Sequence, residues 1–235
     1  MQRIPTHIPG LDSALQGGPV EGSLVLVKGA PGVGKTIFVL QSIYAAALTG
    51  ETGIYFTFDE APQTIGWYSA IFGWDVPTLQ RGKKIYIYYL SEQEYERFRP
   101  DRLDTLKERL EYIIKSTGAK RVAIDSMTTI SLYLARTLGL HTEIDVRAVI
   151  QQVLRTLSDL AKSLGILLYI TVLPDDPAIS TYESIADGIL ELFYYEDVGG
   201  VTQRGLRIPK MRATHHPLDR LSVYIEREGI EVESL

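Results

Sequence analysis

Apolar positions along the chain follow two spacings, and segments with the two spacings alternate. Short apolar runs, typical of buried strands, occur at 24–27, 54–58, 85–89, 122–124 and 166–171. Between the last two runs, apolar residues recur at helical spacing on one face of residues 146–164, and a second such face spans 103–113. Strands that alternate with helices predict an α/β fold with a mostly parallel sheet covered on both faces.

The C-terminal part has a different pattern. Strand-like runs at 189–195, 206–212, 221–225 and 230–232 are joined by turns such as Val198-Gly199-Gly200. Such turns favour hairpins, so we expect an antiparallel extension of the parallel sheet. The sequence has no internal repeat, low-complexity tract or interdomain linker, and residues 1–235 are expected to form a single domain.

A glycine-rich segment stands between the first predicted strand and an amphipathic helix. It fits the phosphate-binding P-loop pattern and consists of Gly29, Ala30, Pro31, Gly32, Val33, Gly34, Lys35 and Thr36. In this context backbone N–H groups surround phosphate oxygens, and the helix N-terminus adds a positive dipole end. Lys35 would reach the β- and γ-phosphates, and the Thr36 hydroxyl would bind Mg²⁺. The segment predicts binding of a nucleoside triphosphate.

Three carboxylates follow predicted strands. Asp125 ends the apolar strand 122–124 in a Walker B arrangement, where it would face the ligand crevice and hold Mg²⁺ through water. The alternative is an ordinary acidic residue in a turn. Asp59 and Glu60 end the strand 54–58, where one of them could deprotonate the attacking water, and the pattern does not decide which. A second, compatible interpretation is that they start a helix at Ala61-Pro62.

Two cations, Lys210 and Arg212, stand two residues apart on a predicted strand, so both side chains are expected to point the same way. Such a pair could bind the γ-phosphate of a nucleotide in a neighbouring subunit, as an arginine finger does. Alternatively, the pair belongs to a solvated strand face or to local ion pairs.

Composition narrows these possibilities. With 45% hydrophobic residues, a chain of this length can bury one substantial core. The lack of cysteine excludes disulfides and thiolate metal sites and fits a reducing cytoplasm. No charged-then-apolar leader is present, and the most apolar interior run, 166–173, is far shorter than the ~20 residues of a membrane helix. We therefore expect a cytoplasmic protein without a membrane partner.

Because the net charge is −5, binding of a nucleic acid would require a local basic patch on the protein. The candidates are residues 81–84 followed by Tyr86, Tyr88 and Tyr89, and the arginines of 97–109, which are Arg97, Arg99, Arg102 and Arg109. For the tyrosines, the alternative is a strand with two differently buried faces. For the arginines, which alternate with acidic residues, the alternative is a solvated surface of ion pairs.

Several motifs together resemble one known family. The run RIPTHIPGLD at 3–12 is similar to the N-terminal signature of KaiC-type domains in the RecA superfamily, as are the P-loop, TFDE at 57–60, AIDS at 123–126 and ADGIL at 186–190. KMRATHH at 210–216 resembles the family's Lys-x-Arg-Gly-Thr-x-His element. The similarity spans nearly the whole chain, and archaeal single-domain proteins, including paralogues of the recombinase RadA, look most alike.

The resemblance implies a RecA-like core, ATP as the ligand, Asp59 and Glu60 as catalytic acids, and Lys210 and Arg212 acting across a subunit interface. Three positions depart from the family pattern: His7 and Ala213 stand where Gly is usual, and Ile37 replaces a second Thr. Because Ala213 would stiffen the finger strand, we expect slow ATP hydrolysis.

Two hypotheses for the wider function follow. The leading one is a RadA-paralogue-like ATPase that binds single-stranded DNA, through central loops expected at 131–145 and 174–184, and modulates a recombinase in homologous recombination or repair. The alternative is a KaiC-like, ATP-dependent regulatory module that binds a protein partner and not DNA. Ring-shaped homo-oligomers are the family expectation, and a monomer is compatible with the sequence.

Overall fold

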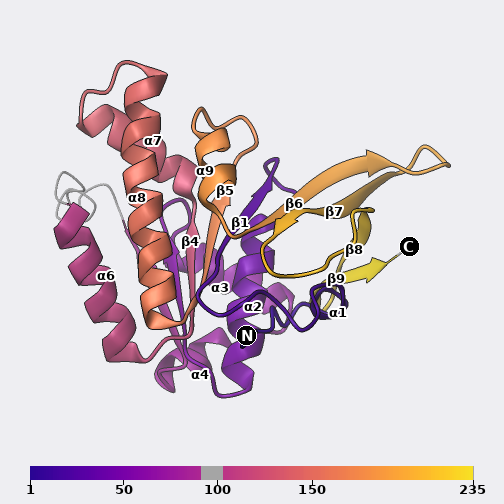
Figure 1. The fold of residues 1–235 in the computed structure, drawn as a ribbon. Helices are drawn as coiled ribbons and strands as arrows, with labels where there is room; N and C mark the ends of the chain where they lie inside the picture. Colours follow the sequence, from indigo (N-terminus) through magenta and orange to yellow (C-terminus); the bar gives the residue numbers. More distant parts are fainter. Residues whose placement is uncertain (91–102, 235) are drawn as a thin grey trace.

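The computed structural model describes residues 1–90 and 103–234, and within these ranges nine strands form one sheet (Figure 1). The strand order is β3-β2-β4-β5-β1-β6-β7-β8-β9. Strands β3 to β6 in this order are parallel, and the last three pairings are antiparallel. The strands are β1 (Leu24–Gly29), β2 (Gly53–Thr57), β3 (Ile85–Tyr89), β4 (Arg121–Asp125), β5 (Leu167–Val172), β6 (Gly188–Glu196), β7 (Thr202–Met211), β8 (Leu221–Glu226) and β9 (Gly229–Ser234). The predicted parallel sheet with an antiparallel extension is confirmed.

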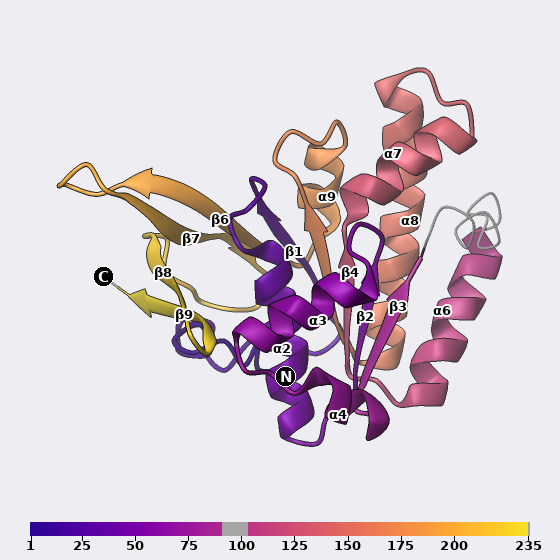
Figure 2. The same cartoon turned by 180° about the vertical axis from the view of Figure 1, so that it is seen from behind.

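Helices cover both faces of the parallel part, as the opposite views of Figures 1 and 2 show. They are α1 (Leu11–Ala14), α2 (Lys35–Leu48), α3 (Pro62–Ile71), α4 (Val76–Arg81), α6 (Leu103–Thr117), α7 (Met127–Thr137), α8 (Glu143–Leu164) and α9 (Ile179–Ile185). No helix in the described ranges has both the length and the hydropathy needed to cross a membrane.

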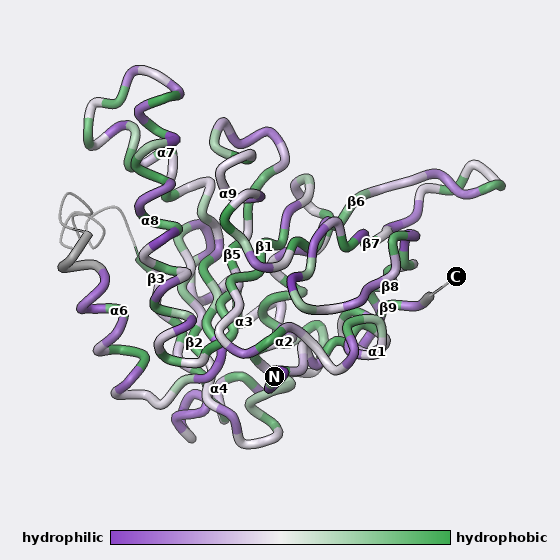
Figure 3. The backbone as a smooth tube through the Cα atoms, viewed as in Figure 1, coloured by the Kyte–Doolittle hydropathy of each residue, from purple (hydrophilic) through white to green (hydrophobic). Residues whose placement is uncertain are grey.

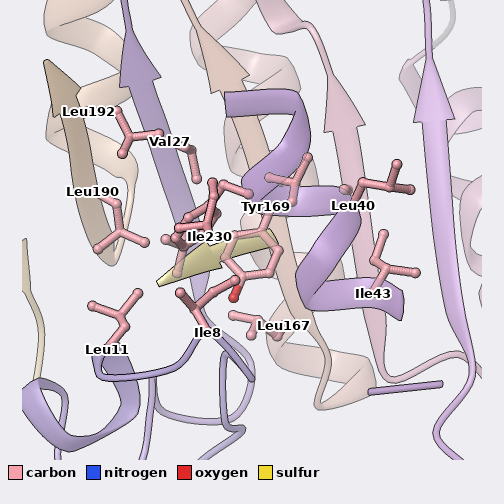
Figure 4. Close-up of a cluster of buried hydrophobic side chains, with 14 of the residues drawn as sticks. Ile8, Leu11, Val27, Leu40, Ile43, Leu167, Tyr169, Leu190, Leu192 and Ile230 are labelled. Atoms are coloured by element: carbon pink, nitrogen blue, oxygen red, sulfur yellow. The ribbon is translucent and has the colours of Figure 1, made fainter. Parts of the chain in front are cut away.

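Successive residues of each central strand point to opposite faces and therefore supply two separate cores. In β1, Val25 and Val27 pack toward α2, whereas Leu24 and Leu26 belong to the cluster beneath α8. The hydrophobic residues accordingly lie along the central strands in Figure 3. Figure 4 shows part of the first core, where side chains from the N-terminal segment, α2 and four strands surround Tyr169.

The two central loops expected at 131–145 and 174–184 are partly helical, so their predicted extent is wrong. Residues 127–137 form α7, whose N-cap Ser126 accepts a hydrogen bond from the backbone N–H of Thr129. Residues 179–185 form α9, which buries Tyr182. Met127, Ile130 and Leu134 are buried and have helical spacing. This spacing indicates a helix, and the prediction of a loop did not take it into account.

A buried cation ties the N-terminal segment to the sheet. Arg121 is completely buried at the start of β4. Its guanidinium donates to the Pro5 carbonyl at 2.8 Å and to Ser42 Oγ at 2.6 Å, and it pairs with Glu51 at 3.2 Å. A buried charge is tolerated when its donors are satisfied in this way. The segment before α1 is thereby held against α2 and β4.

Two of the departures from the family pattern have a backbone consequence. His7 has a φ of 57° and Ala213 a φ of 54°, the left-handed region that favours glycine. The backbone therefore still has the conformation suited to the glycine that the resemblance predicts at each position.

Replacing Ala213 by Gly is expected to raise the free energy of unfolding by about 0.5–1 kcal/mol, because relief of the left-handed strain outweighs the added freedom of the unfolded chain. Urea denaturation followed by circular dichroism measures the change. The matched control is Ala135→Gly inside α7, which should lower the free energy of unfolding by about 1 kcal/mol. If both glycines destabilise equally, Ala213 carries no strain.

Candidate active site

The glycine-rich segment lies at the carboxyl end of β1 and leads directly into α2, as predicted. Gly32 and Gly34 have φ values of 76° and 116°, and Gly34 is the N-cap of α2. At Gly29 a Cβ atom would lie 2.5 Å from the Leu192 carbonyl oxygen, so no larger residue fits there. The turn therefore has the conformation that exposes backbone N–H groups to an anion at a helix N-terminus.

Lys35 bends back over this turn. Its Nζ donates hydrogen bonds to the carbonyl oxygens of Gly29 at 2.7 Å and Ala30 at 3.1 Å. Burial lowers the pKa of Lys35, and the nearby charges of Asp125 and Asp59 oppose that shift. The ammonium thus stands in the hollow of the loop, close to two of the carboxylates predicted from the sequence.

Asp125 collects three hydroxyl donors. The Thr36 hydroxyl donates to Oδ2 at 2.7 Å, the Tyr55 hydroxyl donates to the same oxygen at 2.6 Å, and the Thr171 hydroxyl donates to Oδ1. The side chain lies at the end of β4 and is only 6% exposed. Burial raises the pKa of Tyr55 well above its usual value, and the Asp125 carboxylate adds to the shift, so Tyr55 remains a donor.

The structure brings together the two residues predicted to hold Mg²⁺. Thr36 comes from α2 and Asp125 from β4, and their oxygens meet directly. A hydroxyl and a carboxylate oxygen are the hard ligands that Mg²⁺ takes together with phosphate and water. In the described residues no group of three or more His, Asp or Glu is arranged to hold a metal ion by itself.

Asp59 and Glu60 follow β2 at the same edge of the sheet, but their carboxylates have different partners. Both oxygens of Asp59 accept hydrogen bonds from the N-terminal turn of α7, from Ser126 Oγ at 2.9 Å and Thr129 Oγ1 at 2.5 Å. Glu60 accepts a hydrogen bond from the Tyr68 hydroxyl of α3 at 3.1 Å. Helix α3 does begin at Pro62, as the second interpretation expected, with Ala61 rather than a carboxylate at its N-cap.

The two cations of the C-terminal element do not join this cluster within the chain. Lys210 Nζ donates to the carbonyl oxygens of Glu183 at 2.9 Å and Ser184 at 3.1 Å, at the end of α9. Arg212 pairs with Asp187 at 2.8 Å. Strand β7 ends at Met211, so the expectation that both cations lie on the strand is wrong for Arg212. In the isolated chain, the alternative of local partners describes both residues.

Sequence reasoning missed the hydroxyl donors around Asp125. Tyr55 and Thr171 stand in apolar strands and carry no motif, and only the strand order places β2 and β5 on either side of β4. It also missed Tyr194 of β6. The Tyr194 hydroxyl lies beside the phosphate-binding turn, since a Cβ at Gly32 would lie 3.6 Å from it. No sequence signal indicates that this part of the hairpin lies beside the phosphate-binding turn.

The first candidate patch for nucleic acid is dispersed. Lys84 donates to the Gly50 carbonyl and Arg81 to Thr78, at the amino end of β3, away from the carboxyl edge that carries the carboxylates. Tyr88 stacks on Phe56 with ring centroids 5.2 Å apart, and Tyr86 packs against the same core. The alternative of a two-faced strand therefore describes these tyrosines. Of the second patch, Arg97, Arg99 and Arg102 lie outside the described residues.

Comparison with known proteins adds a family. A family model described as "ATPase: KaiC" matches residues 4–235. A UPF0273 protein of Thermotoga maritima is 32% identical, and the match covers 99% of this chain and 96% of that protein. The circadian clock oscillator protein KaiC of Thermostichus vulcanus is 30% identical over 92% of this chain and 41% of its own length. The crystal structure of a KaiC-like protein from Pyrococcus horikoshii has a TM-score of 0.81 at 29% identity and covers 99% of both chains.

The position of Tyr55 generates a stability prediction. Tyr55→Phe should lower the free energy of unfolding by about 1.5–3 kcal/mol, because it removes a hydrogen bond to a buried carboxylate and keeps the ring. Urea denaturation measures the change. The control is Tyr112→Phe on α6, where the side chain is 74% exposed and no change is expected. Equal behaviour of the two variants would contradict the role given to Tyr55.

Proposed function

The chain belongs to the KaiC family of ATPases. From this premise we propose that it binds ATP with Mg²⁺ at residues 29–36 and hydrolyses the bond between the β- and γ-phosphates. The observation that carries the proposal is the direct contact of Thr36 and Asp125 beside the Lys35 ammonium. A phosphate-binding turn, a cation and a pair of hard metal ligands are the parts that phosphoryl transfer to water requires.

The chain's own groups divide this work. The N–H groups of the turn and the start of α2 bind phosphate oxygens, and Lys35 exchanges its two carbonyl partners for phosphate. Thr36 and Asp125 hold the Mg²⁺, which neutralises charge on the phosphates when it is bound. Tyr55 and Thr171 keep the Asp125 carboxylate in place for that task.

Water activation falls to Asp59 and Glu60. Both follow β2 at the carboxyl edge of the sheet, next to β4 and its Asp125. The hydroxyls of α7 fix the orientation of Asp59, and Tyr68 orients Glu60. A carboxylate held in this way can align a water molecule and take its proton.

The same sheet runs from the parallel strands into the antiparallel extension, which supports one domain over residues 1–235. A contribution of Lys210 and Arg212 to the site of a neighbouring subunit is part of the proposal. It requires that Lys210 leaves the end of α9 and that Arg212 leaves Asp187. This exchange of partners is a physical reason to expect slow hydrolysis by the free chain.

Lys35→Ala should abolish measurable ATP binding, because the loop loses the cation that lies within it. Calorimetric titration with Mg-ATP measures this. Lys120→Ala, an exposed lysine just before β4, is the control and should bind like the unchanged protein. Unchanged affinity in Lys35→Ala would remove the assignment of the phosphate site.

Replacing Asp59 by Asn and Glu60 by Gln together should reduce turnover at least about 100-fold while ATP still binds, because the general base is lost. Phosphate release measures turnover, and the titration above measures binding. Asp159→Asn, an exposed carboxylate on α8, is the control. Hydrolysis at the original rate in the double variant would place water activation elsewhere, and the two single variants assign the base.

The wider role of the ATPase rests on resemblance. Binding of single-stranded DNA and modulation of a recombinase make up the leading hypothesis. Fluorescence anisotropy with a labelled oligonucleotide, with and without ATP, tests it. The expected result is binding with a negative slope of log affinity against log salt concentration, from release of counterions. Absence of binding at low salt would reject the DNA role and leave the regulatory module that binds a protein partner.

A further inference from the structure

Helices α7 and α9 both lie beyond the carboxyl ends of the parallel strands (Figures 1 and 2). Polar side chains that are almost completely buried stand where the two helices meet. Asp176, in the turn before α9, is 3% exposed, and Tyr182 of α9 is fully buried. On α7, Thr128 and Ser131 are buried as well. Burial of polar side chains costs free energy, which hydrogen bonds of defined geometry must offset.

Two hydrogen bonds join the helices. The Tyr182 hydroxyl donates to the carbonyl of Met127, the first residue of α7, at 3.4 Å. The N–H of Leu173, directly after β5, donates to Thr128 Oγ1 at 3.0 Å. Burial raises the pKa of Tyr182, and the charge of Asp176 raises it further, so the phenol stays protonated and remains a donor. The first turn of α7 is thus held by the segment that runs from β5 into α9.

Asp176 fixes the shape of that segment. One of its carboxylate oxygens accepts a hydrogen bond from the Ala178 N–H at 2.8 Å, and its backbone carbonyl accepts one from the Ile179 N–H at 2.9 Å. The other carboxylate oxygen is buried without a hydrogen-bond partner in the described part of the chain. Burial raises the pKa of Asp176, and the Ala178 N–H and the Thr128 hydroxyl oppose that shift. An unpaired buried oxygen lowers stability, and such exceptions are expected at functional sites.

The same turn of α7 also holds one of the two carboxylates proposed for water activation. Ser126 and Thr129 donate to the two oxygens of Asp59, at 2.9 and 2.5 Å. Met127 and Thr128, which stand between these two donors in the sequence, carry the contacts to the α9 segment. Four consecutive residues therefore link Asp59 to the buried contact with α9. A displacement of this turn would move both donors of Asp59 together.

We propose that Asp176 and Tyr182 are positioning residues for hydrolysis, which act through the first turn of α7 to orient the carboxylate of Asp59. This inference rests on the proposed function, in which Asp59 contributes to water activation. Glu60 is held by Tyr68 of α3 instead, so its orientation does not depend on α9. Because a carboxylate must be aligned with the attacking water, loss of its orientation reduces turnover more than it reduces nucleotide affinity.

Steady-state ATP hydrolysis by Tyr182→Phe, which removes one hydroxyl and keeps the ring, tests the proposal. The turnover number should fall at least about fivefold, while the affinity for Mg-ATP, measured by calorimetry, stays within about twofold. The matched control is Tyr169→Phe. Tyr169 is also fully buried, accepts a hydrogen bond from Ser42 Oγ at 3.3 Å and belongs to the other core. Its variant should keep the turnover number within about twofold.

Two substitutions test Asp176. Asp176→Ala removes the acceptor for the Ala178 N–H and should lower the turnover number at least about fivefold. Asp176→Asn keeps an acceptor oxygen on a side chain of the same shape and should retain the turnover number within about twofold. Retention in the amide variant and loss in the alanine variant would mean that the side chain acts through geometry and not through its charge.

A double-mutant cycle separates positioning from a general loss of structure. In the Asp59→Asn background, Tyr182→Phe should change the residual turnover by no more than about twofold, because the group that it positions is already lost. An equal loss with and without the Asp59 carboxylate would make the contact purely structural and overturn the proposal. Full turnover in both Tyr182→Phe and Asp176→Ala would overturn it too, as would an equally large loss in Tyr169→Phe.

Failure of this inference is distinguishable from failure of the proposed function. Hydrolysis at the original rate by Asp59→Asn, together with slow hydrolysis by the Asp59→Asn, Glu60→Gln double variant, would reject only the positioning role, because its target is then dispensable. Hydrolysis at the original rate by the double variant would reject the proposed water activation, and the positioning role with it.

Discussion

The carboxylate of Asp125 is the constraint on which the site depends. A charged group that is 6% exposed is stable only if hydrogen bonds replace the water it has lost. Its three hydroxyl donors come from β2, from α2 and from β5, so one side chain connects the strands on either side of β4 with the helix that follows the P-loop. A shift of any of these elements would leave a buried charge or hydroxyl unpaired, which is why the edge of the sheet and the phosphate-binding turn keep one geometry.

Asp59 and Lys35 lie near Asp125 at the carboxyl edge of the sheet. The carboxyl ends of parallel strands lie at the same edge of a sheet, so residues that are distant in sequence come close together there. Asp59 is then oriented by hydroxyls of α7, and Lys35 by carbonyls of the loop itself. In the proposed function these contacts are exchanged for contacts with phosphate, metal or water, so that one polar partner replaces another. Without a ligand, both side chains keep hydrogen-bond partners within the chain.

The C-terminal element has a different position. Lys210 and Arg212 are satisfied within their own chain, at the end of α9 and at Asp187. Asp187 in turn accepts a hydrogen bond from the Leu24 N–H, at the start of the strand that leads to the P-loop. The β8–β9 turn contacts α2 through Gln41, further along the same helix. The antiparallel extension is therefore linked to the start of β1 through Asp187 and to α2 through Gln41, the two elements that flank the P-loop.

The strand and helix order and the P-loop followed from local pattern, because hydrophobic period and glycine spacing are properties of neighbouring residues. The match of Thr36 with Asp125 was expected for the same reason, since a strand that ends in an acid directs that acid to the carboxyl edge. The expectation of central loops missed α7, although its apolar residues have helical spacing, and it missed α9, which has only seven residues. Local pattern did not reveal the roles of Tyr55 and Thr171, since which strands flank β4 is a property of the sheet. Tertiary structure alone decided the partners of Lys210 and Arg212, because contacts between distant segments depend on how the chain packs and not on which residues are neighbours in the sequence.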